Sequence, residues 1–131
     1  MTMKKKVLSA IVACVAVVAM AFTAYATSIN WNVNLPNWGG NAILIDSEKS
    51  KSSDHATNRI DFMGGDYDSM EVWMKVDGSK TYGKTEQYKG NNDYTMTMGG
   101  TKDKGTKVVV YGENASNTYV NVTARGYCNI F

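Results

Sequence analysis

Hydrophobic and polar residues alternate along several short segments of the chain, and a period of two predicts β-strands. The clearest case is the stretch SINWNVNL at residues 28–35, which ends at Pro36. Its apolar positions are Ile29, Trp31, Val33 and Leu35, and its polar positions are Asn30, Asn32 and Asn34. Because asparagine is a poor strand former, a polar face made only of asparagine is either a binding surface or the solvated side of a neutral edge strand.

Similar patterns recur along the rest of the chain, separated by glycine-rich turns. They predict strands at residues 42–45, 59–63, 70–76, 94–98, 106–111, 120–124 and 127–131. Asp77 and Gly78 give a tight hairpin signal after 70–76, with only a weak return strand at 79–82. Residues 106–111 are apolar on both faces, so we expect them in the centre of a sheet.

Two further segments give specific structural expectations. Residues 46–58 are polar, charged and without large apolar side chains, which predicts an exposed loop. Gly126 interrupts the last alternating segment, which predicts a bulge followed by a final edge strand at 127–131.

Taken together, the pattern predicts an all-β fold of six to eight short strands with no helix after residue 26. Such a chain forms a small antiparallel β-sandwich or a partly open barrel. The sequence shows no internal repeat and no segment of different composition that would mark a second domain. Residues 27–131 are therefore expected to form a single domain.

The first 26 residues have the three regions of a secretory signal peptide. Three lysines at 4–6 precede an uncharged apolar stretch at 7–22, and Ala24-Tyr25-Ala26 provides small residues at a cleavage site. Two alternatives are a retained membrane anchor and a lipid attached at Cys14. The cleaved signal is preferred, and it predicts a secreted protein without a lasting transmembrane anchor.

Charge and cysteine content change the picture only slightly. The net charge of +2 depends on Lys4, Lys5 and Lys6, and without them the 12 acidic residues slightly outnumber the basic ones. No basic surface for nucleic acid is therefore expected. Cys128 would be the only cysteine after cleavage, either as a buried apolar side chain or as an intermolecular disulfide partner.

The residues available for catalysis are few. His55 is the single histidine and lies in the predicted loop, and Cys128 lies in an apolar strand, so neither has an obvious catalytic partner. The segment GGDYDSME places Asp66, Asp68 and Glu71 close together, either as a solvated acidic turn or as weak calcium candidates. We predict a protein that is not an enzyme and needs no cofactor.

Aromatic side chains are the main candidates for binding. Trp31 shares a face with apolar neighbours, which favours core packing. Trp73 lies on the polar face of 70–76, either packed under a loop or exposed as a platform, and Trp38 lies in a Pro-Gly-Gly loop. Trp38, Trp73 and the asparagine row Asn30, Asn32 and Asn34 are the predicted ligand-binding residues.

A short bacterial export signal, an all-β chain rich in Asn, Gly, Tyr and Thr, and the aromatic ending Gly126-Tyr-Cys-Asn-Ile-Phe131 carry a resemblance. The chain resembles the small secreted β-sandwich proteins of Gram-positive bacteria, including lactococcin-type bacteriocins and uncharacterised proteins encoded near bacteriocin-type transporters. The resemblance implies contact with envelope precursors or membranes without enzymatic activity. Lactococcin-type mature chains are shorter, so no functional residue is carried over.

Three functions follow from these features. The first is a secreted, bacteriocin-like protein that binds a component of the cell envelope. The second is a carbohydrate-binding module that uses exposed tryptophan and asparagine side chains. The third is an extracellular structural protein that assembles through strand edges, because no charged residue occurs from Thr27 to Ile45. The sequence does not predict an oligomeric state.

Overall fold

The computed structural model describes residues 28–131 except residues 79, 117 and 118. Eight β-strands make up this part of the chain, and no helix occurs in it. The strands are β1 (Ser28–Leu35), β2 (Asn41–Glu48), β3 (Ser53–Met63), β4 (Ser69–Val76), β5 (Lys80–Tyr88), β6 (Tyr94–Lys102), β7 (Lys107–Asn114) and β8 (Val122–Ile130). The predicted signal segment 1–26, with its alternatives of an anchor or a lipid on Cys14, lies outside the described residues.

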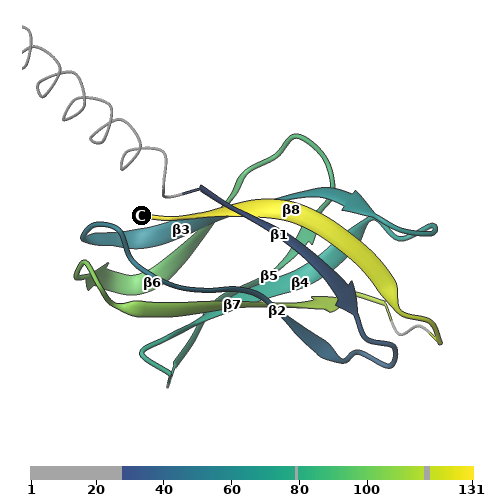
Figure 1. Ribbon diagram of the computed structural model, residues 1–131, viewed down its shortest axis with the longest axis horizontal. Coiled ribbons are helices and arrows are strands. Elements are labelled where there is room, and N and C mark those ends of the chain that lie inside the picture. Colours follow the sequence, from purple (N-terminus) through teal and green to yellow (C-terminus); the bar gives the residue numbers. More distant parts are fainter. Residues whose placement is uncertain (1–27, 79, 117–118) are drawn as a thin grey trace, which may run out of the picture.

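The strands form two four-stranded antiparallel sheets. Sheet A has the order β1-β8-β3-β6, and sheet B has the order β2-β7-β4-β5. Only the β4–β5 hairpin stays within one sheet, and every other connection passes from one sheet to the other. Figure 1 shows the two sheets packed against each other as layers. The predicted antiparallel β-sandwich is confirmed.

The core lies between the sheets. Its buried apolar residues come from every strand except β5, whose partly buried Tyr82 packs against them, and methionines contribute from both sheets. Its buried members include Trp31, Leu35, Ile60, Met63, Met70, Val72, Met74, Met96, Met98, Val108, Val110, Val122, Ala124, Cys128 and Ile130. Methionine is unbranched and flexible, a side chain suited to filling irregular space between packed sheets. The alternation read from the sequence therefore identifies most of this core.

Several predicted positions are confirmed by the strand order. The segment 106–111 lies in β7, which is flanked by β2 and β4 in the middle of sheet B. Residues 28–35 form β1 at the edge of sheet A. The tight hairpin signal at Asp77 and Gly78 is also confirmed: both residues lie between the paired Val76 and Lys80, and their φ values of 52° and 77° are in the left-handed region that such turns use.

The predicted loop at residues 46–58 is wrong. β2 continues to Glu48 and β3 begins at Ser53, so the connection between them is short. Within β3 only Ala56 and Asn58 turn inward at this end, and both are buried. A small and a polar side chain on the buried face conceal the period of two, which explains why the sequence pattern does not reveal the strand.

Lys49 in this connection is an unusual buried residue. Its side chain is almost completely covered, and its ammonium group donates hydrogen bonds to Ser53 Oγ and to the main-chain oxygen of Phe131. Burial lowers the pKa of Lys49, and the nearby carboxylate of Asp54 opposes that shift. The lysine thus links the start of β3 to the residue that follows β8.

The expectation of a bulge at Gly126 followed by an edge strand is also wrong. β8 runs without interruption from Val122 to Ile130 and lies between β1 and β3. The irregularity is in β3, between Ile60 and Phe62, opposite Gly126. The glycine is needed for space, because a Cβ atom there would lie 1.9 Å from the Arg59 carbonyl oxygen and 2.6 Å from Trp31 Cζ2.

Candidate functional site

Two exposed aromatic rings meet at one end of the sandwich. Trp38 in the β1–β2 loop is 64% exposed and Tyr119 in the β7–β8 loop is 79% exposed. Their ring centroids are 4.6 Å apart, with the planes almost perpendicular. These two loops lie side by side at the right-hand end of the view in Figure 1.

Hydrogen bonds and backbone geometry hold this aromatic pair in place. The backbone N–H of Asn37 donates to Asn121 Oδ1 at 3.0 Å, and Asn37 Nδ2 donates to the Tyr119 carbonyl oxygen at 3.4 Å. Trp38 has a φ of 60°, a left-handed conformation that is rare for a bulky side chain. A strained backbone conformation costs free energy and persists only where the surrounding structure maintains it. Such conformations are concentrated at binding and catalytic sites.

A hollow of about 200 Å³ lies next to the aromatic pair. It is lined by Gly64, Gly65, Tyr67, Val120, Asn121, Val122 and Thr123. Asn121 belongs both to this hollow and to the hydrogen bonds that tie the two loops together. The sequence identified Trp38 as a candidate but missed Tyr119, because nothing along the chain relates residues so far apart.

The asparagine row Asn30, Asn32 and Asn34 lies on the outer face of β1, and all three side chains are exposed. Their cross-strand neighbours on β8 are Tyr127, Arg125 and Thr123. Thr123 Oγ1 donates a hydrogen bond to Asn34 Oδ1 at 3.0 Å. The row is therefore a solvated edge surface on the same strand whose apolar face packs into the core, and it does not meet Trp73, which lies in sheet B.

Trp73 lies on the outer face of sheet B, yet it is only 7% exposed. Its ring stacks on Tyr111 of β7, with centroids 5.8 Å apart and an angle of 9° between the planes. The ammonium of Lys84 lies 5.1 Å above the Trp73 ring. The alternative of an exposed Trp73 platform is therefore wrong: neighbouring strands rather than a loop cover the ring.

A pair of carboxylates lies beside this covered tryptophan. Glu71 and Glu113 are direct cross-strand neighbours, and Lys84 Nζ lies 3.5 Å from Glu71 Oε2 and 3.8 Å from Glu113 Oε1. Burial raises the pKa of Glu113, and hydrogen bonding to Glu71 raises it further, whereas Lys84 lowers it. The cluster is a compact surface charge network on the outer face of sheet B.

The calcium candidates are distributed over two elements. Asp66 and Asp68 are exposed in the β3–β4 connection, whereas Glu71 lies within β4 and pairs with Lys84. Over residues 28–131, apart from the three positions left undescribed, no group of three or more His, Cys, Asp or Glu side chains is arranged to hold a metal ion.

The two residues considered for catalysis lie on paired strands of sheet A. His55 is in β3, and its Nδ1 lies 3.0 Å from Asp54 Oδ1, a hydrogen bond that lowers the pKa of Asp54. Cys128 in β8 is fully buried, and burial raises the pKa of its thiol to about 12. A buried thiol in the protonated state is a poor nucleophile. Of the two alternatives for this residue, the buried side chain is the one observed.

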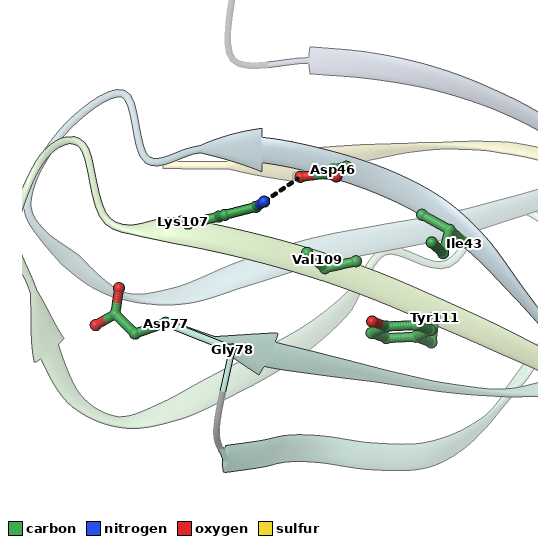
Figure 2. A pocket seen from close by; sticks show the side chains of 7 residues that line it. All are labelled: Ile43, Asp46, Asp77, Gly78, Lys107, Val109 and Tyr111. Atoms are coloured by element: carbon green, nitrogen blue, oxygen red, sulfur yellow. Dashed lines mark ion pairs between the residues drawn. The ribbon is translucent and has the colours of Figure 1, made fainter.

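A larger hollow of about 500 Å³ lies on the outer face of sheet B and extends from Ile43 and Tyr111 to the β4–β5 turn (Figure 2). It is lined by Ile43, Asp46, Asp77, Gly78, Lys107, Val109 and Tyr111. Sequence reasoning missed this site because its residues come from β2, β7 and the β4–β5 turn. One signal was available. Ile43 and Tyr111 are apolar residues on the outer faces of strands whose inner faces are already apolar, which indicates an apolar patch on the outer surface.

Comparisons with known proteins give no relative for this chain: no family model, curated protein or solved structure matches it. In the part of the chain that the structure describes, no helix has the length and hydrophobicity needed to span a membrane.

Proposed function

We propose that this chain is a secreted, non-enzymatic protein that binds a carbohydrate polymer of the bacterial cell envelope through Trp38 and Tyr119. The observation that carries the proposal is the exposure of both rings on loops that hydrogen bonds tie together. The export signal read from residues 1–26 supports a location outside the cell.

The geometry of the pair favours a ligand with flat apolar faces. Both the exposure of the two aromatic rings and the left-handed conformation of Trp38 reduce stability. Burial of the rings in the core would be favourable, and the left-handed backbone is strained. Two rings set almost at right angles offer one face and one edge, which a sugar chain can contact through its C–H groups. The strained, exposed pair is therefore better explained by binding than by packing.

The surroundings of the pair favour a neutral ligand. Residues 36–40 and 115–121 contain no charged side chain. Recognition of a nucleic acid relies on lysine and arginine, which these loops lack. The amides of Asn37 and Asn121 each use one atom in the hydrogen bonds that join the loops. An amide has two N–H groups and an oxygen with two lone pairs, so both side chains have further capacity for sugar hydroxyl groups.

The experiment is a pelleting assay with insoluble peptidoglycan, chitin and cellulose. We expect the protein to sediment with at least one polymer, and we expect Trp38→Ala and Tyr119→Ala each to weaken binding by about tenfold or more, since an aromatic contact at a binding surface contributes ~1–3 kcal/mol. Tyr88→Ala is the matched control, because Tyr88 is also exposed but lies at the end of β5.

Two results would overturn the proposal. One is that the wild-type protein stays in solution with all three polymers. The other is that Trp38→Ala and Tyr119→Ala both sediment as well as the wild type, which would place the contact elsewhere on the surface. Circular dichroism of each variant shows whether the β-structure is retained.

A second candidate function, assembly through strand edges, is favoured by the position of β1. β1 is an edge strand of sheet A, and none of its eight residues is charged. Natural sheets usually protect their edges with charged residues. Light scattering at increasing protein concentration, with Asn32→Lys as the variant that should prevent association, distinguishes this candidate from a monomeric binding protein.

A further inference from the structure

β1 is more regular than the other three strands that lie at the edges of the sheets. β1 (dark blue in Figure 1) and β6 are the edges of sheet A, and β2 and β5 are the edges of sheet B. Register shifts interrupt the pairing of β2, β5 and β6 with their neighbours, whereas β1 pairs with β8 without a shift from Ser28 to Leu35. Bulges are one of the features that keep a sheet edge from pairing with another chain. β1 lacks this protection.

The other edge strands also carry charge, which β1 does not. Their charged residues are Asp46 and Glu48 in β2, Lys80, Lys84 and Glu86 in β5, and Lys102 in β6. All eight residues of β1 are uncharged. Charged side chains usually prevent the association of sheet edges. Of the four edge strands in the described part of the chain, β1 is therefore the one that is both regular and uncharged.

The side chains of β1 are arranged symmetrically about Asn32. A second β1 strand that runs antiparallel, with Asn32 opposite Asn32, brings asparagines together on the outer face and apolar residues together on the inner face. The resulting pairs are Asn32–Asn32, Asn30–Asn34, Trp31–Val33 and Ile29–Leu35. Two amides suit each other because each has both N–H donors and an acceptor oxygen, and asparagine ladders stabilise paired strands. β1 is thus complementary to a second copy of itself.

Other registers fit less well. A shift of one residue places asparagines opposite apolar side chains, because successive side chains of a strand point to opposite faces. A shift of two residues in one direction brings Pro36, which has no N–H group, opposite Asn30. A shift of two in the other direction leaves Asn34 opposite Ser28. The register centred on Asn32 is the one that pairs all three asparagines.

We propose that two copies of this chain pair along β1, antiparallel and about a two-fold axis at Asn32, which joins their A sheets into one continuous sheet. The inference rests on the second candidate function, assembly through strand edges, and adds the partner, the symmetry and the register. The side chains of Asn30 and Asn32 form no hydrogen bond with any described residue, so they are available to bond across the axis.

The interface would also cover apolar surface that is left open at the edge of the sandwich. Ile29 and Val33 are only partly buried against the core. In the proposed register a second β1 strand lies alongside them and excludes more water from both side chains. Because the strands are antiparallel and Trp38 follows β1, the aromatic pairs of the two copies would lie beyond opposite ends of the joined strands.

The test is disulfide cross-linking of cysteine variants, detected on a non-reducing gel. Asn32→Cys places two thiols directly opposite each other, with Cα atoms ~4.5–5.5 Å apart, a separation that a disulfide spans. Asn30→Cys and Asn34→Cys each leave the two thiols displaced by roughly 13 Å along the strands. Cys128 does not interfere, because its side chain is buried.

The register predicts a specific pattern of cross-links. We expect Asn32→Cys to form the covalent dimer about tenfold faster than Asn30→Cys alone or Asn34→Cys alone. We expect an equimolar mixture of Asn30→Cys and Asn34→Cys to cross-link readily, because those two positions face each other. Trp38→Ala in the Asn32→Cys background should leave cross-linking unchanged, whatever its result in the pelleting assay.

Sedimentation velocity measures the association without a covalent bond. Asn32→Lys places two ammonium groups opposite each other, and we expect it to weaken dimerisation by about fivefold or more. Asn32→Thr is the matched control, because threonine is uncharged and suited to strands, and it should dimerise like the wild type. Circular dichroism shows whether each variant keeps its β-structure.

Two failures can be told apart. If the wild type sediments only as a monomer up to ~1 mM, the proposal is overturned and assembly through strand edges fails with it. If the wild type associates but Asn32→Cys cross-links no faster than Asn30→Cys or Asn34→Cys alone, this interface is overturned while assembly through another edge or register stands. Equal dimerisation of Asn32→Lys and Asn32→Thr would also overturn it.

Discussion

The indole Nε1 of Trp31 donates a hydrogen bond to Asn58 Oδ1 at 2.9 Å, across the strand that separates them. Trp31 is in β1 and Asn58 is in β3, and β8 lies between these strands in sheet A. The indole reaches across because Gly126 of β8 has no side chain in its path. Asn58 Nδ2 in turn donates to Gln87 Oε1 at 2.8 Å, which connects the two sheets.

Replacing Asn58 with leucine should strongly destabilise the fold. The substitution preserves the approximate shape but leaves the buried N–H of Trp31 and the side chain of Gln87 without this partner. We expect the free energy of unfolding to fall by about 2–4 kcal/mol, since each buried polar group left unpaired costs ~1–3 kcal/mol. Urea denaturation measures the loss, and a change below about 0.5 kcal/mol would contradict the role of this hydrogen bond.

Gly126→Ala tests the space that the indole occupies. The new Cβ would meet a backbone oxygen of β3 at 1.9 Å, and backbone atoms cannot move aside without separating the strands. We expect a loss of roughly 3 kcal/mol or more, or failure to fold. Gly64→Ala is the control, because its Cβ would have no neighbour closer than 3.7 Å. Equal stability of the two variants would show that the strand spacing adjusts.

Cys128 should be unreactive in the folded protein. Its side chain is fully buried and its thiol pKa is raised to about 12, so very little thiolate is present at neutral pH. We expect labelling of the Cys128 peptide by a thiol reagent, followed by mass spectrometry, to be about a hundredfold slower than in urea. Equally fast labelling with and without urea would contradict the observed burial.

The carboxylate pair on sheet B should make stability depend on pH. Because the pKa of Glu113 is raised, chiefly by burial, the folded protein binds a proton there more tightly than the unfolded chain. The resulting stabilisation is present below the ordinary pKa of glutamate and is lost as the pH rises through the raised value.

Glu113→Gln replaces the titrating carboxyl with a neutral amide. We expect the variant to gain stability relative to the wild type as the pH is raised from about 4 to about 8, and the two proteins to converge at the acidic end of that range. Urea denaturation across this range provides the measurement. A difference that stays constant with pH would show that Glu113 is not the group responsible.

Much of the fold could be predicted from the sequence because most strands have large apolar residues on one face. β4 and β7 are examples, with methionine and valine at the buried positions. β3 could not be predicted over its full length, because its first inward residues are Ala56 and Asn58, which have no hydrophobic signal. The long-range hydrogen bond between Trp31 and Asn58 explains why an asparagine is buried there.

The candidate site was only partly predictable for a related reason. Trp38 could be identified from its loop, since an aromatic residue between turn residues has little reason to be buried. Its partner Tyr119, and the hollow around Tyr111, depend on which strands become neighbours, and alternation along one strand does not contain that information. Trp73 was a candidate from the sequence because it lies on the polar face of its strand. The structure covers it with Tyr111 and Lys84 of the adjacent strands, which the sequence pattern does not reveal.

The most direct test of the proposed carbohydrate contact is oxidation of tryptophan by N-bromosuccinimide. Trp38 is the exposed tryptophan, whereas Trp31 and Trp73 are only 4% and 7% exposed. In the free protein, Trp38 should be oxidised first, and mass spectrometry of its peptide gives the rate. With the protein bound to an envelope polymer, we predict that oxidation of Trp38 slows by about tenfold or more, since a contacted ring is shielded from the reagent. An unchanged rate in the bound protein would contradict the claim that Trp38 contacts the polymer.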